Sequence, residues 1–170
     1  MIDATYCQLM ADYNRWMNQS LYACAAQLSD AQRREDRGAY FKSVHGTLNH
    51  LLYGDLAWMY RFTGRPLDGL NPEDGLRGDF TQLQARRVAL DAEIGTWAAG
   101  VDPAWLAADF SYLSMAYQQR YTRPAWALVT HFFNHQTHHR GQLTTLLMQF
   151  GIDPGVTDLP MLPAWDSAAR

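Results

Sequence analysis

The sequence offers little that would place the chain on a nucleic acid, in a membrane or outside the cell. Its 170 residues carry a net charge of -3, so there is no excess of lysine and arginine for phosphate contacts, and we expect no nucleic-acid partner. No apolar run is long enough to span a bilayer, and no basic segment followed by an apolar one opens the chain. We therefore expect a cytoplasmic protein with no membrane partner.

Cysteine is also scarce. Cys7 and Cys24 are the two cysteines of the chain, and both lie in one amphipathic stretch whose helical geometry points them in different directions. We expect no disulfide between them, and we expect each to be a small buried apolar residue.

Apolar residues recur at steps of three and four in four parts of the chain, a spacing typical of amphipathic helices. The predicted helices cover residues 3–29, 40–62, 80–100 and 124–150. The segments between them are predicted to be a polar connection at 29–40, a loop rich in Gly, Pro and Asp at 64–79, and a short hairpin within 101–121. The last stretch, residues 152–170, is predicted to be an extended tail packed on the surface.

Four helices of this length favour an all-α fold, a four-helix bundle in which residues 1–170 form one domain. The connections between the helices are long enough to cross from one end of the bundle to the other. The apolar pattern by itself therefore leaves the order of helix directions open.

The six histidines fall into two short windows, one in the second predicted helix and one in the fourth. They are His45 and His50, then His131, His135, His138 and His139. At about 100° per residue, the four histidines of the last helix and Gln142 share one stripe that borders the apolar face. A histidine in such a place is often an ordinary core residue, but four on one stripe indicate a site.

Histidines four residues apart on a helix can bind one metal ion, and both His131/His135 and His135/His139 qualify. Zinc and similar ions favour imidazole nitrogen, and a pair needs a third ligand from elsewhere. His50 is surrounded on its helix by small residues such as Gly46 and Gly54, which leave space for an ion or a neighbouring helix. His45 points to another side. Residue 136 is Gln, so the glutamate of the zinc-protease helix motif is absent.

Two segments resemble the DinB-like proteins of the DinB/YfiT-like superfamily of proposed metal-dependent enzymes. They are "TLNHLLYGDLAWMYRFTG" (47–64) and "HFFNHQTHHRGQLTTLLMQFGIDPGVTDLP" (131–160). The resemblance implies a four-helix bundle in up-up-down-down order, usually a homodimer. It also implies a zinc or nickel ion held by one histidine of the second helix and two of the fourth, which are His50, His135 and His139 in this sequence.

The remaining histidines of the fourth helix lie outside that triad. The family often has tyrosine at the position of His138, and His131 is not a family ligand. Characterised superfamily members include transferases and isomerases that use low-molecular-weight thiols. The resemblance therefore implies a small-molecule substrate, with a thiol as a candidate cosubstrate.

These observations leave two functions open. In the first, the protein is a metal-dependent hydrolase or thiol-dependent S-transferase, because three histidine ligands leave a position for water or substrate. In the second, it is a non-catalytic metal-stabilised binding or stress-response interaction module, whose fourth ligand is a side chain such as His131 or Asp55.

Two charged residues are candidates for catalysis. Asp55 could act as a general base, although it lies about 140° from His50 around the helix and could equally orient a ligand or pair with an arginine. Arg87 interrupts an apolar seam and could recognise an anionic substrate. Its alternative role is an ion pair with Asp91, four residues further along.

Overall fold

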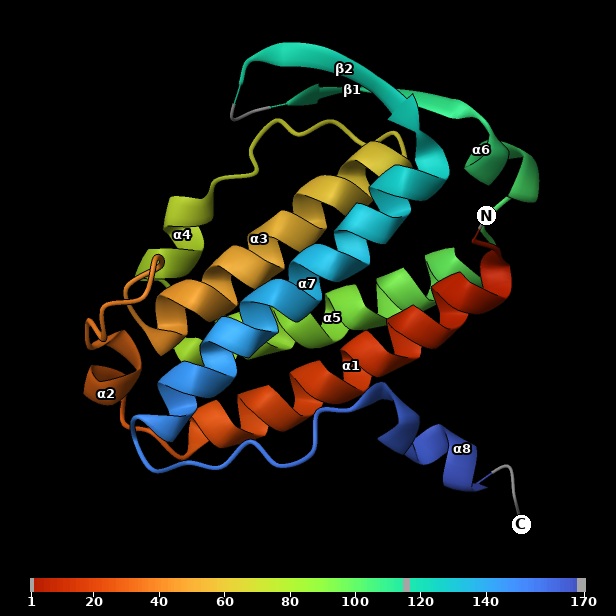
Figure 1. The fold of residues 1–170 in the computed structure, drawn as a ribbon. Coiled ribbons are helices and arrows are strands. Elements are labelled where there is room, and N and C mark those ends of the chain that lie inside the picture. Colours follow the sequence, from red (N-terminus) through yellow and green to blue (C-terminus); the bar gives the residue numbers. More distant parts are fainter. Residues whose placement is uncertain (1, 115–116, 168–170) are drawn as a thin grey trace.

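Four long helices make up most of the chain in the computed structural model, which describes residues 2–114 and 117–167 (Figure 1). They are α1 (Ala4–Ala26), α3 (Val44–Phe62), α5 (Phe80–Ala99) and α7 (Ala125–Met148). The side chains of Asp3, Ser43 and Asp79 cap the first three by accepting a hydrogen bond from a backbone N–H of the first turn. The protein is thus mostly helical, and the four helical segments predicted from periodicity are confirmed.

The second predicted helix begins later than expected, at Val44 instead of near residue 40. The chain just before it bends sharply, because Lys42 has a φ of 69° and pairs with Ala39 in an isolated bridge. Ser43 then caps the helix through the N–H of Gly46. The bend and the cap therefore set the start of α3 at Val44 and leave residues 40–43 outside the helix.

Several short elements lie between or after the long helices. They are α2 (Asp30–Arg34), α4 (Pro72–Arg77), α6 (Pro103–Ala107), β1 (Asp109–Ser114), β2 (Gln119–Pro124), η1 (Leu159–Met161) and α8 (Pro163–Ser167). The strands form an antiparallel hairpin in which Tyr112 faces Tyr121, as predicted for this region. The predictions of a plain connection at 29–40, a loop at 64–79 and an extended tail miss α2, α4, η1 and α8.

α3 and α7 lie side by side and run in opposite directions (Figure 1). The ring centres of His50 and His139 are 4.4 Å apart. About two turns later in α3, the ring centre of Trp58 lies 5.4 Å from that of His131, which is about two turns earlier in α7. This antiparallel pairing places His50, in the first half of α3, opposite His135 and His139 near the middle of α7.

The order of helix directions differs from the expected up-up-down-down order. α5 runs parallel to α3, because Asp55 contacts Arg87 and Phe62 stacks on Trp97. α1 runs parallel to α7, because Tyr6 contacts Phe133 near their beginnings and Asn14 bonds Arg140 further along. The order along the chain is therefore up-down-down-up.

The crossover that produces this order is the segment between α3 and α5. It returns along the outside of α3 and brings α4 against the first half of that helix (Figure 1). His45 Nε2 donates to Gly75 O at 3.0 Å, and Asn49 Nδ2 donates to Pro72 O at 3.0 Å. A residue larger than Gly75 would collide with the Asn49 side chain, so this glycine lets the two helices approach.

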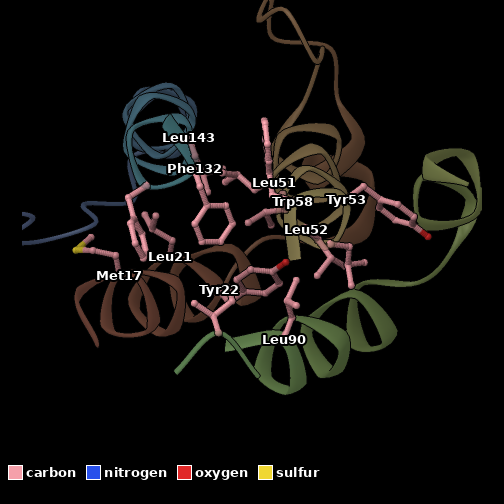
Figure 2. Packing of buried hydrophobic residues seen from close by; sticks show 14 of the residues in the cluster. Met17, Leu21, Tyr22, Leu51, Leu52, Tyr53, Trp58, Leu90, Phe132 and Leu143 are labelled. Carbon is pink, nitrogen blue, oxygen red and sulfur yellow. The ribbon is translucent and has the colours of Figure 1, made fainter. Parts of the chain in front are cut away.

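The apolar core lies between the four long helices, and Figure 2 shows side chains from all of them meeting there. Leu21 of α1, Leu52 of α3, Leu90 of α5 and Phe132 of α7 are each at most 2% exposed. Cys7 and Cys24 are buried free thiols, as predicted. In the described part of the chain, no helix has the length and apolar character needed to cross a membrane.

Candidate metal centre

Three histidine rings from α3 and α7 converge on one point. His50 Nε2 lies 3.2 Å from His135 Nε2 and 3.1 Å from His139 Nε2. Among the described residues, this trio is a group of three side chains whose ligand atoms all lie within 4.8 Å of one another. The i, i+4 pair on α7 meets a single histidine from α3 because the two helices are antiparallel neighbours.

The spacing of the three nitrogens fits a divalent metal ion. Tetrahedral ligands at the usual zinc–imidazole distance of about 2.0–2.1 Å are roughly 3.3–3.4 Å apart, close to the two distances from His50 Nε2. Neutral imidazole nitrogens facing one another repel through their lone pairs. A cation between them turns this repulsion into three attractive bonds.

A hydrogen bond fixes the orientation of His139. Its Nδ1–H donates to Gln142 Oε1 at 2.9 Å, which leaves Nε2 with the lone pair that faces the other two rings. Gln142 Nε2 donates in turn to His138 Nε2 at 3.3 Å. His138 is exposed and contributes to this chain of bonds from outside.

Packing fixes the other two rings. Phe41, from the segment before α3, stacks on His50 with ring centroids 3.7 Å apart. The side chain of His135 passes over Gly54, and a Cβ at that position would come within 2.9 Å of His135 Cε1. The small residue predicted to leave space around His50 therefore makes room for the His135 ring from the neighbouring helix.

Burial lowers the pKa of all three imidazoles. The pKa of His50 falls from its ordinary value of 6.5 to about 4, through burial first and the neighbouring His139 second. The pKa of His135 falls to about 3, because it is buried and has several other histidines beside it. The pKa of His139 is lowered by burial as well. All three are neutral at pH 7, which is the state that binds metal.

The two remaining histidines of the sequence pattern lie elsewhere. His131 is exposed, and its ring packs against Trp58. The ring centres of His131 and His135 are 5.9 Å apart. His45 is buried on another side of α3, where it holds α4 in place. Neither belongs to the group of converging nitrogens.

Asp55 and Arg87 form a buried ion pair in the interior. Arg87 Nη1 is 2.6 Å from Asp55 Oδ2, and Arg87 Nη2 is 2.9 Å from Asp91 Oδ1. All three side chains are at most 4% exposed, and Asp91 also accepts a hydrogen bond from Asn18. The structure therefore places the two catalytic candidates, Asp55 and Arg87, between α1, α3 and α5. Of the two roles considered for Arg87, the geometry shows the i, i+4 ion pair with Asp91.

A cavity of about 900 Å³ borders the histidine cluster. Its walls are one face of α3, the segment before that helix, and the crossover with α4. His50 and Arg61 of α3, Phe41 before it, and Leu70 and Leu76 of the crossover all line it. His50 is therefore the member of the histidine cluster that lines this cavity.

The sequence profile described as "DinB family" matches residues 1–169. The chain belongs to the DinB family. It is also similar to Protein DinB of Bacillus subtilis (strain 168), with 24% identity over 163 residues, which cover 86% of this chain and 87% of that protein.

Sequence reasoning missed three features of this candidate site. Gln142 was placed on the histidine stripe, but its bond to His139 was not foreseen, although a spacing of three residues on a helix allows it. Phe41 was placed inside the second predicted helix, at residues 40–62, whereas it precedes α3 and stacks on His50 through the tertiary fold. The cavity was not predicted either, since its outer wall comes from aperiodic segments.

Proposed function

We propose that this DinB family protein binds a divalent metal ion through His50, His135 and His139 and is a metal-dependent enzyme. The observation that carries the proposal is the convergence of three neutral imidazole nitrogens beside a large cavity. A bound ion of this kind makes a coordinated water or thiol more acidic and polarises a carbonyl group.

Zinc or nickel is the proposed ion, because both are well suited to imidazole ligands. Structural zinc sites are usually closed by four protein ligands, whereas catalytic sites keep a position for water or substrate. Within the described residues, neither His131 nor Asp55 joins the three converging nitrogens: the first packs on Trp58 and the second pairs with Arg87. This arrangement supports an open fourth position rather than a closed structural site.

The proposed reaction is a hydrolysis or the transfer of a low-molecular-weight thiol to an electrophile. Both need a metal-activated nucleophile and a cavity for a small molecule, and the cavity lined by His50 supports such a reaction. We further propose that the chain forms a four-helix bundle, that the bundle dimerises and that the protein is cytoplasmic. Light scattering of the purified protein tests the dimer directly.

The experiment that tests the open position uses the protein loaded with Co(II), whose visible spectrum reports coordination. Addition of azide or a simple thiol should change the visible bands, because the added ligand replaces a solvent molecule on the ion. A spectrum that responds to neither ligand would indicate four protein ligands and favour the non-catalytic module. A screen of thiols with electrophiles and of ester substrates, with and without a chelator, then separates transferase from hydrolase.

A further inference from the structure

A positively charged side chain shares the cavity with the histidine cluster. Arg61 lies on the same face of α3 as His50, since positions 50, 54, 57 and 61 follow helical steps of four and three. The Cα atoms of His50 and Arg61 are separated by eleven residues, or roughly 16 Å along the helix axis. Tyr53, Gly54 and Ala57 line the cavity between them, so two of the three residues on this part of the wall are small.

The guanidinium of Arg61 is held in place by the hairpin. It lies 4.9 Å from the ring centre of Trp58 and 5.6 Å from that of Tyr112, and Nη2 donates to Leu113 O at 3.3 Å. Aromatic faces and a carbonyl position a cation without neutralising it. The group is therefore oriented in advance and keeps its full charge.

The other cations on the cavity wall have carboxylate partners. Arg34 pairs with Asp30 at 3.0 Å and donates to two backbone carbonyls, and Lys42 lies 3.9 Å from Asp36. Arg61 has no ion pair with a carboxylate in the part of the chain that the structure describes, and its Nε is buried without a hydrogen-bond partner there. Burial also lowers the pKa of Arg61, which reflects a guanidinium that has lost water and gained no anion.

We propose that Arg61 is a specificity-determining residue that binds an anionic group, a carboxylate or a phosphate, on a substrate whose other end reaches the metal. This inference rests on the proposed metal site at His50, His135 and His139. The planar guanidinium suits such anions because it can donate two parallel hydrogen bonds. The substrate class is thus a small elongated molecule with a metal-seeking group at one end and an anion at the other.

The test uses thiols that carry an anion at the far end. The full-length protein loaded with Co(II) is titrated with ω-mercaptocarboxylates from mercaptoacetate to mercaptoundecanoate, and with ω-mercaptoalcohols of equal length. The Co(II)–thiolate absorption band reports binding. At the chain length that spans the cavity, the carboxylate should bind about tenfold more tightly than the alcohol, because a charge-assisted hydrogen bond is added. Thiols with a phosphonate end show whether carboxylate or phosphate is preferred.

Substitutions at two neighbouring arginines assign the effect. Arg61→Gln should abolish the preference for the anionic thiol while the affinity for the alcohol and the metal content stay the same. Arg61→Lys should keep part of the preference. Arg65→Gln is the matched control, because Arg65 lies four residues further along, pairs with Glu93 and does not line the cavity, so the preference should persist.

The outcomes separate this inference from the proposed function. If the thiolate band forms but the anion makes no difference at any length, or if Arg61→Gln keeps the preference, Arg61 is only a support for the hairpin and the inference is wrong. If no thiol produces a band, the open metal position itself is wrong, and the role of Arg61 in the substrate site falls with it.

Discussion

A different local contact holds each of the three converging histidine rings. His50 is stacked on Phe41, His135 passes over Gly54, and His139 donates to Gln142. A ring stack, a missing Cβ and a hydrogen bond restrict the rings in different ways. Substitution of each supporting residue should therefore have its own effect on metal binding.

Gln142→Ala should lower metal affinity while leaving the fold intact. The substitution removes the acceptor that fixes the orientation of His139, and loss of such an outer hydrogen bond typically costs about 10–100-fold in affinity. Competition with a chromophoric chelator measures the change. The exposed Asn134 of the same helix provides the control, since Asn134→Ala should have no effect. Equal affinities for the two variants would show that Gln142 does not position the ligand.

Gly54→Ala should also weaken metal binding, because the new methyl group would collide with His135 Cε1. In an open helical position the same change stabilises a protein by roughly 0.5–1 kcal/mol. Gly95→Ala on α5, which has nothing within 4 Å of the added Cβ, should show that ordinary gain. Thermal unfolding and metal titration of both variants distinguish the cases. A Gly54→Ala protein with normal metal affinity would contradict the close approach of His135.

The stability of the metal-free protein should fall as the pH drops from 6.5 to about 5. The folded state keeps His50 and His135 neutral, with pKa values of about 4 and about 3, whereas the unfolded chain binds protons near the ordinary value of 6.5. Because the unfolded state binds more protons in this range, stability is lost as the pH falls.

Thermal unfolding of the metal-free protein at several pH values measures this loss. His50→Gln should give a shallower decline than the unchanged protein, because one of the titrating rings is gone. An unfolding temperature that does not change between pH 6.5 and about 5 would mean that the rings are not held neutral.

At the scale of helices and strands, periodic segments were predictable and short capped ones were not. The steps of three and four gave all four long helices, because each buries one apolar face. α2 and α4 carry local signals, the capping box from Ser29 to Gln32 and the pair Asn71-Pro72, but each is too short to show a period. The start of α3 was misplaced because the bend at Lys42 is not evident from the apolar pattern.

Removal of Arg87, which pairs with Asp55 of α3 and Asp91 of α5, should strongly destabilise the protein. Arg87→Leu would leave the buried carboxylates of Asp55 and Asp91 without a cation, and breaking such a buried pair typically costs about 3–5 kcal/mol. Urea unfolding measures the free energy. Glu93→Gln, which breaks the part-exposed pair with Arg65, should cost only about 0–1 kcal/mol. Similar small losses in both variants would refute a structural role for Arg87.

At the scale of the whole molecule, the site depends on how α3 and α7 are brought together. The spacing of the sequence left two histidine pairs open, His131/His135 and His135/His139, and the family resemblance selected the second. The small residues around His50 indicated where a partner helix could approach. The sequence could not give the up-down-down-up order, because its long connections allow several arrangements. That order is what sets the first half of α3 against the second half of α7.

The charged candidates show the limit of reading residue types from a sequence. Asp55 and Arg87 have the chemistry of catalytic groups, but they lie in the interior and neutralise each other. Arg61 attracted no notice in the sequence, since one arginine near a helix end is ordinary. Its place on the cavity wall depends on the crossover and the hairpin, which come from distant parts of the chain.

The most direct measurement is the metal content of protein purified without an affinity tag, together with single histidine variants. The unchanged protein should bind one divalent ion per chain, and His50→Ala or His139→Ala should lose most of it, because either change leaves only two converging nitrogens. His138→Ala should keep the ion, since His138 is exposed and lies outside the cluster. Equal loss in all three variants, or no ion in the unchanged protein, would contradict a site built from His50, His135 and His139.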